Sequence, residues 1–175
     1  MLDLPNLLSL SRIAALLPLF VLLATGQAWW AAALFVAAAA TDLLDGHLAR
    51  RLGKVSAFGA TLDPVADKVL VNGTALLLAG LGALGLWGTL AAALILAREF
   101  AVSGLREAAG GGALPVTRFA KYKSAAQMAA LTLLIVAPEL PLIAHRAGIV
   151  LLWIAAALTL WTGAGYVRRA LGSLR

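Results

Sequence analysis

Long apolar stretches separated by short polar or glycine-rich breaks organise this chain. Hydrophobic residues make up 62% of its 175 positions and charged residues only 13%. A helix that crosses the hydrocarbon core of a bilayer needs about 20 mostly apolar residues, each rising about 1.5 Å. Six segments meet this need: 7–25, 29–51, 57–81, 86–109, 117–137 and 147–170. The pattern therefore predicts an all-α integral membrane protein with six transmembrane helices, in a single transmembrane domain over residues 1–175.

The breaks between these segments are marked by glycine, proline and charged residues, which interrupt or terminate helices. They fall at 26–27, 51–56, 82–85, 110–115 and 138–146. We expect His145 and Arg146 in the last of these, in an outer loop. Trp29, Trp30 and Trp87 stand at segment ends and are typical of an interfacial aromatic belt.

The positive charges indicate how the chain is oriented. Of its fourteen Lys and Arg residues, all but Lys68 and Arg146 fall near the two termini, between the second and third segments, or around the fourth and fifth. Cytoplasmic loops carry such an excess, so we expect both termini to be cytoplasmic. The net charge of +6 is therefore explained by loops, and a nucleic-acid partner is not expected.

The inventory of possible ligands limits the chemistry. The chain has no cysteine and two histidines far apart, so neither disulfides nor a zinc site are expected. Any metal ion would therefore be bound by oxygen atoms. Because no basic region precedes the first apolar run and no cleavage site is evident, we expect 7–24 to be a retained span.

Two aspartates lie near the end of the second segment. Asp42, Asp45, Gly46 and Ala49 fall within an arc of roughly 100°, because spacings of three, four and seven return to one helix face. The two small residues let a ligand or a neighbouring helix approach the backbone closely. Arg50 lies at the edge of this face.

A second pair of aspartates, Asp63 and Asp67, shares one face of the third segment, with Gly59 one turn earlier. For this pair to reach the depth of Asp42, the third helix should begin near Ser56, and Pro64 would then kink it. A rival interpretation begins the helix at Asp63 as N-cap, with the proline at its first position.

Four carboxylates this close repel one another, and carboxylates in a membrane helix normally face a protein interior or a wet cavity. Hard oxygen ligands suit Mg²⁺, Mn²⁺ or Ca²⁺, and two divalent ions would neutralise four charges, Mg²⁺ or Mn²⁺ being the cofactor we expect. A site of this kind suits phosphoryl chemistry, since divalent ions stabilise charge on a leaving group. Two alternatives remain: pairing with Arg50, Lys68 or Arg98, and a divalent-cation transporter.

The order Asp42, Asp45, Gly46, Ala49, Arg50, Gly59, Asp63, Asp67 resembles the motif of the CDP-alcohol phosphatidyltransferase family. Further stretches are similar to the bacterial phosphatidylglycerophosphate synthase branch, and together the resemblance covers nearly the whole chain. They are Pro5-Asn6-Leu7-Leu8, Leu62-Asp63-Pro64-Val65-Ala66-Asp67-Lys68, Ala97-Arg98-Glu99-Phe100, Leu105-Arg106-Glu107, Lys121-Tyr122-Lys123 and Leu158-Thr159-Leu160-Trp161. Ser9 and Ser124 stand where that branch often has threonine, and both keep a hydroxyl.

The resemblance implies a six-helix membrane enzyme, usually a homodimer. Because the aspartates flank the first large cytoplasmic loop, we expect the active site to open to the cytoplasm from the cell inner membrane. The enzyme would transfer the phosphatidyl group of CDP-diacylglycerol to sn-glycerol 3-phosphate by direct attack, releasing CMP. By position, the metal ligands would be Asp42, Asp45, Asp63 and Asp67, with Asp67 also the base that deprotonates the acceptor hydroxyl. The site for the cytidine diphosphate moiety would comprise Asn6, Ser9, Asp42, Asp45, Gly46, Ala49, Arg50, Gly59 and Asp63.

A basic cluster around the fourth and fifth segments is the candidate for binding the acceptor's phosphate. It consists of Arg98, Arg106, Lys121 and Lys123. Guanidinium and ammonium groups bind phosphate through charge-assisted hydrogen bonds. Ordinary cytoplasmic flanking charge is the alternative. Inositol phosphate, serine and phosphatidylglycerol remain possible acceptors, because the aspartate motif alone does not separate them.

Overall fold

The computed structural model describes residues 4–52, 57–108 and 119–173, with side chains described at 7, 9–41, 65–105 and 122–165. Within these ranges the chain is helical and contains no strand. The helices are α1 (Leu4–Ala14), α2 (Leu16–Ala24), α3 (Ala28–Leu52), α4 (Ala57–Gly80), α5 (Gly85–Ala108), α6 (Phe119–Val136) and α7 (Leu142–Ser173), with a 3-10 turn η1 (Ala137–Glu139) before α7. The all-α prediction is confirmed for these residues.

The first predicted segment forms two helices, α1 and α2, that meet at Ala15. Pro18 has no N–H, so the carbonyl of Ala14 loses its usual intrahelical donor. Ala15 nevertheless keeps helical dihedral angles (φ −62°, ψ −21°), and the N–H of Leu19 donates to its carbonyl at 3.0 Å. The interruption is therefore local.

Helix α4 begins at Ala57, as the depth of the aspartates requires, and runs without a break through Pro64 to Gly80. Asp63 is thus an interior residue of α4. The rival interpretation, with Asp63 as an N-cap, is wrong. A proline inside a helix removes one backbone hydrogen bond, and packing against neighbouring helices compensates for that loss.

Helix α7 begins earlier than the sequence predicts. Leu140 is extended (φ −121°, ψ 161°), and the helix follows directly after Pro141. Proline is well suited to this position because an N–H there would lack an intrahelical partner. His145 and Arg146 therefore lie in the first turns of α7 and not in a loop, and Nε2 of His145 lies 2.9 Å from the carbonyl oxygen of Ala83.

Two glycines make the tight turns after α2 and α4. Gly26 (φ 73°) and Gly82 (φ 74°) adopt the left-handed conformation that other residues avoid. Each is followed by a residue whose N–H donates back across the last helical turn, Gln27 to Leu22 and Ala83 to Leu78. This is the Schellman arrangement, which satisfies the final helix carbonyls.

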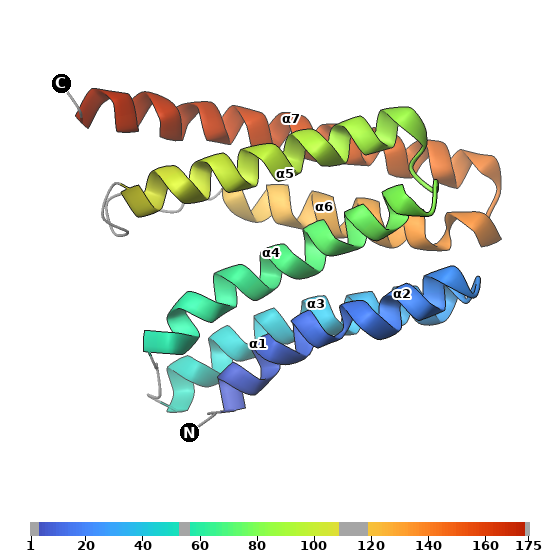
Figure 1. Ribbon diagram of the computed structural model, residues 1–175, viewed down its shortest axis with the longest axis horizontal. Helices are drawn as coiled ribbons and strands as arrows, with labels where there is room; N and C mark the ends of the chain where they lie inside the picture. Colours follow the sequence, from blue (N-terminus) through green and yellow to red (C-terminus); the bar gives the residue numbers. More distant parts are fainter. Residues whose placement is uncertain (1–3, 53–56, 109–118, 174–175) are drawn as a thin grey trace.

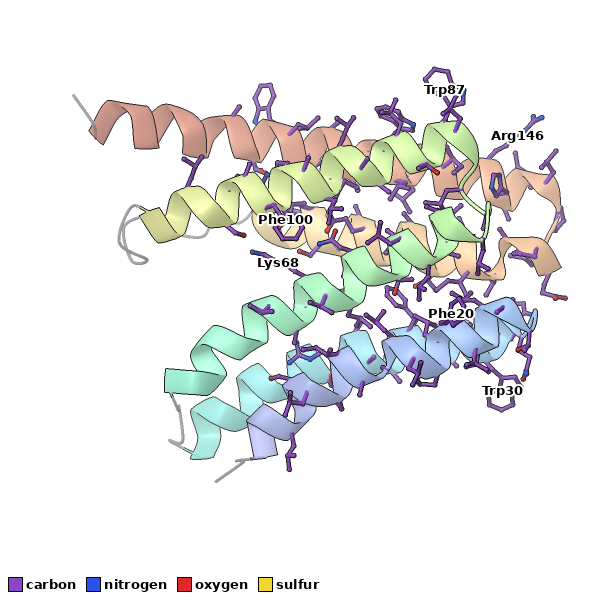
Figure 2. The ribbon with its side chains drawn as sticks, viewed as in Figure 1. Phe20, Trp30, Lys68, Trp87, Phe100 and Arg146 are labelled. Carbon is purple, nitrogen blue, oxygen red and sulfur yellow. The ribbon has the colours of Figure 1, made fainter. Side chains whose placement is uncertain are left out.

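The helices form an elongated bundle. α7 packs along α5 and α6, α1 packs on α3 and α4, and α4 also contacts α5 (Figure 1). One end of the bundle holds the first turn of α1, the C-terminal end of α3, the N-terminal end of α4 and the last turn of α7 (Figure 1). The side chains of Trp30, Trp87 and Arg146 lie at the opposite end (Figure 2). These two tryptophans are exposed, as is Trp29, which precedes Trp30 on α3; that they form an interfacial belt stays a prediction.

Leucines and small residues fill the centre of the bundle. Leu70, Leu131 and Leu152, from α4, α6 and α7, are each no more than 1% exposed. Ala91 and Ala155 are also fully buried and let helix backbones approach closely. This packing fixes the rotation of each helix and hence the direction of its polar side chains.

Two stretches of the described chain are long and apolar enough to cross a membrane: Gly85–Leu105 in α5 and Leu142–Gly165 in α7. Ser9–Ala24 and Ala28–Thr41 form shorter apolar helices. All six predicted segments correspond to helices, while the number that span the bilayer stays a prediction.

Candidate functional site

The two aspartate pairs lie on neighbouring helices. Asp42 and Asp45 belong to α3, Asp63 and Asp67 belong to α4, and these helices are in contact. Of the four side chains, only that of Asp67 is described, and it is partly buried. Among the described side chains, no group of three His, Asp or Glu residues could hold a metal ion.

Most of the predicted cytidine diphosphate site also falls on residues whose side chains the structure does not describe. These are Asn6, Asp42, Asp45, Gly46, Ala49, Arg50, Gly59 and Asp63. Ser9 is the described member, and it is fully buried on α1, which packs against α3 and α4. The metal-ligand and nucleotide-binding assignments remain predictions.

Arg12, one turn after Ser9 on α1, is a buried cation that the sequence patterns did not single out. Its side chain is fully buried. A buried guanidinium is retained only where anionic or carbonyl groups compensate its charge. Its position indicates that the α1 side of the aspartate helices is polar.

The predicted acceptor cluster is partly assembled around Glu99 of α5. One carboxylate oxygen of Glu99 accepts from Nη1 of Arg98 at 3.3 Å and also from Nζ of Lys123 on α6. The three side chains are 9%, 11% and 12% exposed, so the ion pairs are mostly shielded from water. Two cations share one carboxylate, which leaves an excess positive charge among these three groups. Arg106 and Lys121 lie outside the described side chains.

A second set of contacts joins this cluster to α4. Lys68, the residue after Asp67, donates from Nζ to Oγ of Ser103 on α5. Ser103 in turn donates to the backbone carbonyl of Glu99 at 2.7 Å, one turn earlier on α5. The partly buried Asp67 therefore lies on α4 at the level of the Arg98–Glu99–Lys123 cluster.

Helix α7 completes the cluster from the other side. Nη2 of Arg98 donates to Oγ1 of Thr162 at 3.0 Å. One turn deeper, the buried Gln127 of α6 lies 3.5 Å from Oγ1 of the buried Thr159 of α7. A polar seam thus runs between α5, α6 and α7 within an otherwise apolar bundle.

A cavity of about 380 Å³ lies between α4 and α5 beside this polar level. Its polar end is formed by Lys68, Glu99 and Ser103, and the rest of its wall is mostly apolar. In Figure 2 the side chain of Lys68 extends from α4 toward α5, beside the exposed Phe100. Such a cavity suits a molecule with a charged head and a hydrocarbon tail.

The sequence predicts Arg98 and Lys123 as members of the basic cluster, and the structure brings both to the carboxylate of Glu99. Sequence reasoning missed the contacts of Lys68 with Ser103 and of Arg98 with Thr162. Only the contact of Ser103 with the backbone of Glu99 had a signal in the sequence, because Ser103 lies four residues after Glu99, on the same face of α5.

Comparison with known proteins identifies the family of this chain. Residues 2–161 match the CDP-alcohol phosphatidyltransferase family. The chain is 43% identical to a CDP-diacylglycerol–glycerol-3-phosphate 3-phosphatidyltransferase of Pseudomonas fluorescens, over 96% of this chain and 90% of that protein. It is 41% identical to the Escherichia coli (strain K12) protein of the same name, over 98% and 97% of the two chains.

A plant protein is similarly related. The chain is 40% identical to CDP-diacylglycerol–glycerol-3-phosphate 3-phosphatidyltransferase 1, chloroplastic/mitochondrial, of Arabidopsis thaliana. The similarity covers 96% of this chain but 62% of that longer protein. Because the family match extends over residues 2–161, most of the chain, the chain belongs to the CDP-alcohol phosphatidyltransferase family.

Proposed function

We propose that this protein transfers the phosphatidyl group of CDP-diacylglycerol to sn-glycerol 3-phosphate, forming phosphatidylglycerophosphate and CMP. The observation that carries this proposal is the identity of 41–43% to bacterial proteins named for that reaction, over almost the full length of each chain. The shielded, positively charged cluster on α5 and α6 supports a phosphorylated acceptor.

The setting we propose is the inner membrane of the cell, with six spans, both termini and the active site on the cytoplasmic side, and two copies of the chain in a homodimer. The distribution of Lys and Arg supports the orientation. The lipid substrate could then reach the site from within the bilayer.

The donor side of the reaction is assigned to the aspartates. Oxygen donors on two adjacent helices fit Mg²⁺ or Mn²⁺, so Asp42, Asp45, Asp63 and Asp67 would hold two ions. When bound, these ions neutralise charge on the diphosphate of CDP-diacylglycerol and on the departing CMP. Gly46, Ala49 and Gly59 leave space beside these carboxylates, and Asn6, Ser9 and Arg50 complete the proposed nucleotide site.

The acceptor side is assigned to the basic cluster. Arg98 and Lys123 would bind the phosphate of glycerol 3-phosphate by charge-assisted hydrogen bonds, joined by Arg106 and Lys121. Glu99 holds the first two together and lowers the local charge enough for both to be buried in one place. An incoming phosphate would exchange some of these contacts for its own.

Asp67 is proposed to take the proton of the acceptor hydroxyl. The hydroxyl oxygen then forms a bond to the lipid-linked phosphorus, the bond from that phosphorus to CMP breaks, and CMP departs with the electron pair. The placement of Lys68 against Ser103 supports this role, because it keeps Asp67 at the level of the acceptor cluster.

The cavity between α4 and α5 is assigned to hydrocarbon of the lipid substrate. Its mostly apolar walls and its polar end at Lys68, Glu99 and Ser103 support an acyl chain that enters with the phosphate toward that end.

The experiment that tests the proposed function uses purified protein in detergent–lipid micelles with CDP-diacylglycerol, Mg²⁺ and sn-glycerol 3-phosphate. Mass spectrometry should detect phosphatidylglycerophosphate and CMP in equal amounts. CMP formation without a new phospholipid, or no reaction under these conditions, would contradict the proposal.

A further inference from the structure

Helix α7 contributes no charged group to the described part of the acceptor cluster, yet it touches the Arg98 side chain at two successive residues. Thr162 accepts a hydrogen bond from Nη2 of Arg98. The next residue, Gly163, is buried directly beneath the same side chain. A Cβ atom at position 163 would lie 2.7 Å from Nε and 3.1 Å from Cγ of Arg98.

Because position 163 has no side chain, the Arg98 side chain can lie directly against α7 at this point. Real Cβ atoms essentially never lie closer than 3.0 Å to a non-bonded heavy atom, so any larger residue would displace Arg98. The three nearest atoms are Nε, Cγ and Cδ of Arg98, all in the side chain, so we expect the arginine side chain to shift and the helix backbone to stay in place.

The Thr162 hydroxyl is itself held in one orientation. Its oxygen lies 2.9 Å from the carbonyl of Leu158 and 3.0 Å from that of Thr159, so its proton is directed back to its own helix. A hydroxyl that donates in this way presents its lone pairs outward, toward Nη2 of Arg98.

We infer that Thr162 and Gly163 are positioning residues of the acceptor site: they fix the Arg98 guanidinium beside Glu99 and Lys123 in the geometry that receives the acceptor's phosphate. This inference rests on the proposed function, in which Arg98 binds that phosphate. It extends the site to α7, through residues that have no charge of their own. Bidentate recognition by a guanidinium depends strongly on orientation, so a small displacement is enough to weaken it.

The test measures kcat and KM for both substrates in Gly163→Ala and Thr162→Val. For each variant we expect the KM for glycerol 3-phosphate to rise about tenfold, as expected for disturbing one charge-assisted hydrogen bond, with kcat and the KM for CDP-diacylglycerol within about twofold of wild type. Thr162→Ser keeps the hydroxyl and should restore the wild-type KM.

Gly148→Ala is the matched control. It is the same substitution in the same helix, and its Cβ would come equally close to a flexible side chain, 2.8 Å from Cδ2 and Cγ of Leu134. The neighbour is apolar and lies far from Arg98 along the helix. We expect the KM for glycerol 3-phosphate to be unchanged in this variant, so a rise equal to that of Gly163→Ala would overturn the inference.

Arg98→Lys distinguishes the proposed role of Arg98 in binding the acceptor from the inferred role of Thr162 and Gly163 in positioning Arg98. If this variant raises the KM for glycerol 3-phosphate but Gly163→Ala and Thr162→Val do not, the positioning role is overturned and the acceptor role of Arg98 stands. If Arg98→Lys leaves this KM unchanged, both are overturned. In the double variant Arg98→Lys/Gly163→Ala, the second change should add little, because the guanidinium that Gly163 is inferred to position is already absent; fully additive effects would contradict positioning through Arg98.

Discussion

Lys68 of α4 donates a hydrogen bond to Ser103 of α5, and this contact places the neighbouring Asp67 at the level of the acceptor cluster. Ser103 donates a hydrogen bond to the backbone carbonyl of Glu99, and the carboxylate of Glu99 forms ion pairs with Arg98 and Lys123. The residue proposed as base and the residues proposed to bind the acceptor are therefore joined by a continuous set of contacts through α4, α5 and α6.

Replacing Asp67 by Asn should remove the base while keeping the shape of the side chain. Because general base catalysis contributes about 10²–10⁴-fold, we expect kcat to fall by at least about 100-fold. CMP release measures the rate, and equilibrium binding of CDP-diacylglycerol shows whether the donor site is intact. Glu139→Gln is the control, since this carboxylate is exposed in η1 and outside the proposed site. Turnover near the wild-type rate in folded Asp67→Asn, with donor bound, would exclude Asp67 as the base.

Removing divalent ions should abolish the reaction if the aspartates act as proposed. We expect chelation by EDTA to stop CMP release, and added Mg²⁺ or Mn²⁺ to restore it. Electron paramagnetic resonance of bound Mn²⁺ should count two ions per chain, and fewer in Asp63→Asn. Full activity after exhaustive chelation would rule out the metal-dependent mechanism.

Replacing Glu99 by Gln should destabilise the protein, because it leaves Arg98 and Lys123 facing each other without the shared carboxylate. Breaking a buried ion pair by removing one partner costs about 3–5 kcal/mol. The midpoint of thermal unfolding in detergent should fall clearly below that of wild type, while Glu139→Gln should leave it unchanged. Equal midpoints for the two variants would show that the ion pairs of Glu99 contribute little to stability.

The helices could be predicted from the sequence because each apolar run is long and its boundaries carry glycine or proline. The position of Asp63 inside α4 also followed, since the two aspartate pairs had to reach similar depths. The early start of α7 did not follow, because Pro141 begins a helix as readily as it ends a loop.

The contacts between distant helices lay beyond sequence reasoning for a different reason. The distances from Lys68 to Ser103 and from Arg98 to Thr162 depend on how each helix is rotated against its neighbours, and the packing of buried leucines and alanines sets that rotation. The sequence likewise gives no reason to distinguish Gly163 from the other small residues of the chain. Only the path of the Arg98 side chain shows why a side chain is excluded there.

Filling the cavity between α4 and α5 should hinder binding of the lipid donor. Leu96 lines this cavity from α5, so Leu96→Trp should raise the KM for CDP-diacylglycerol by about threefold or more, as expected when apolar ligand volume is displaced. Leu90→Trp places the same side chain at an exposed position of the same helix that does not line the cavity. If the two variants have the same KM, the cavity does not hold the acyl chain.

The preference for a phosphorylated acceptor tests the central claim most directly. The measurement is the ratio of kcat/KM for sn-glycerol 3-phosphate to that for glycerol, which offers hydroxyl groups without the phosphate, in wild type and in Lys123→Gln. We predict a ratio of about 10³ or more in wild type, because a site built for a charged group strongly rejects an analogue that lacks it, and a ratio at least about tenfold smaller in the variant. Comparable use of the two acceptors by the wild-type protein would contradict the proposed function.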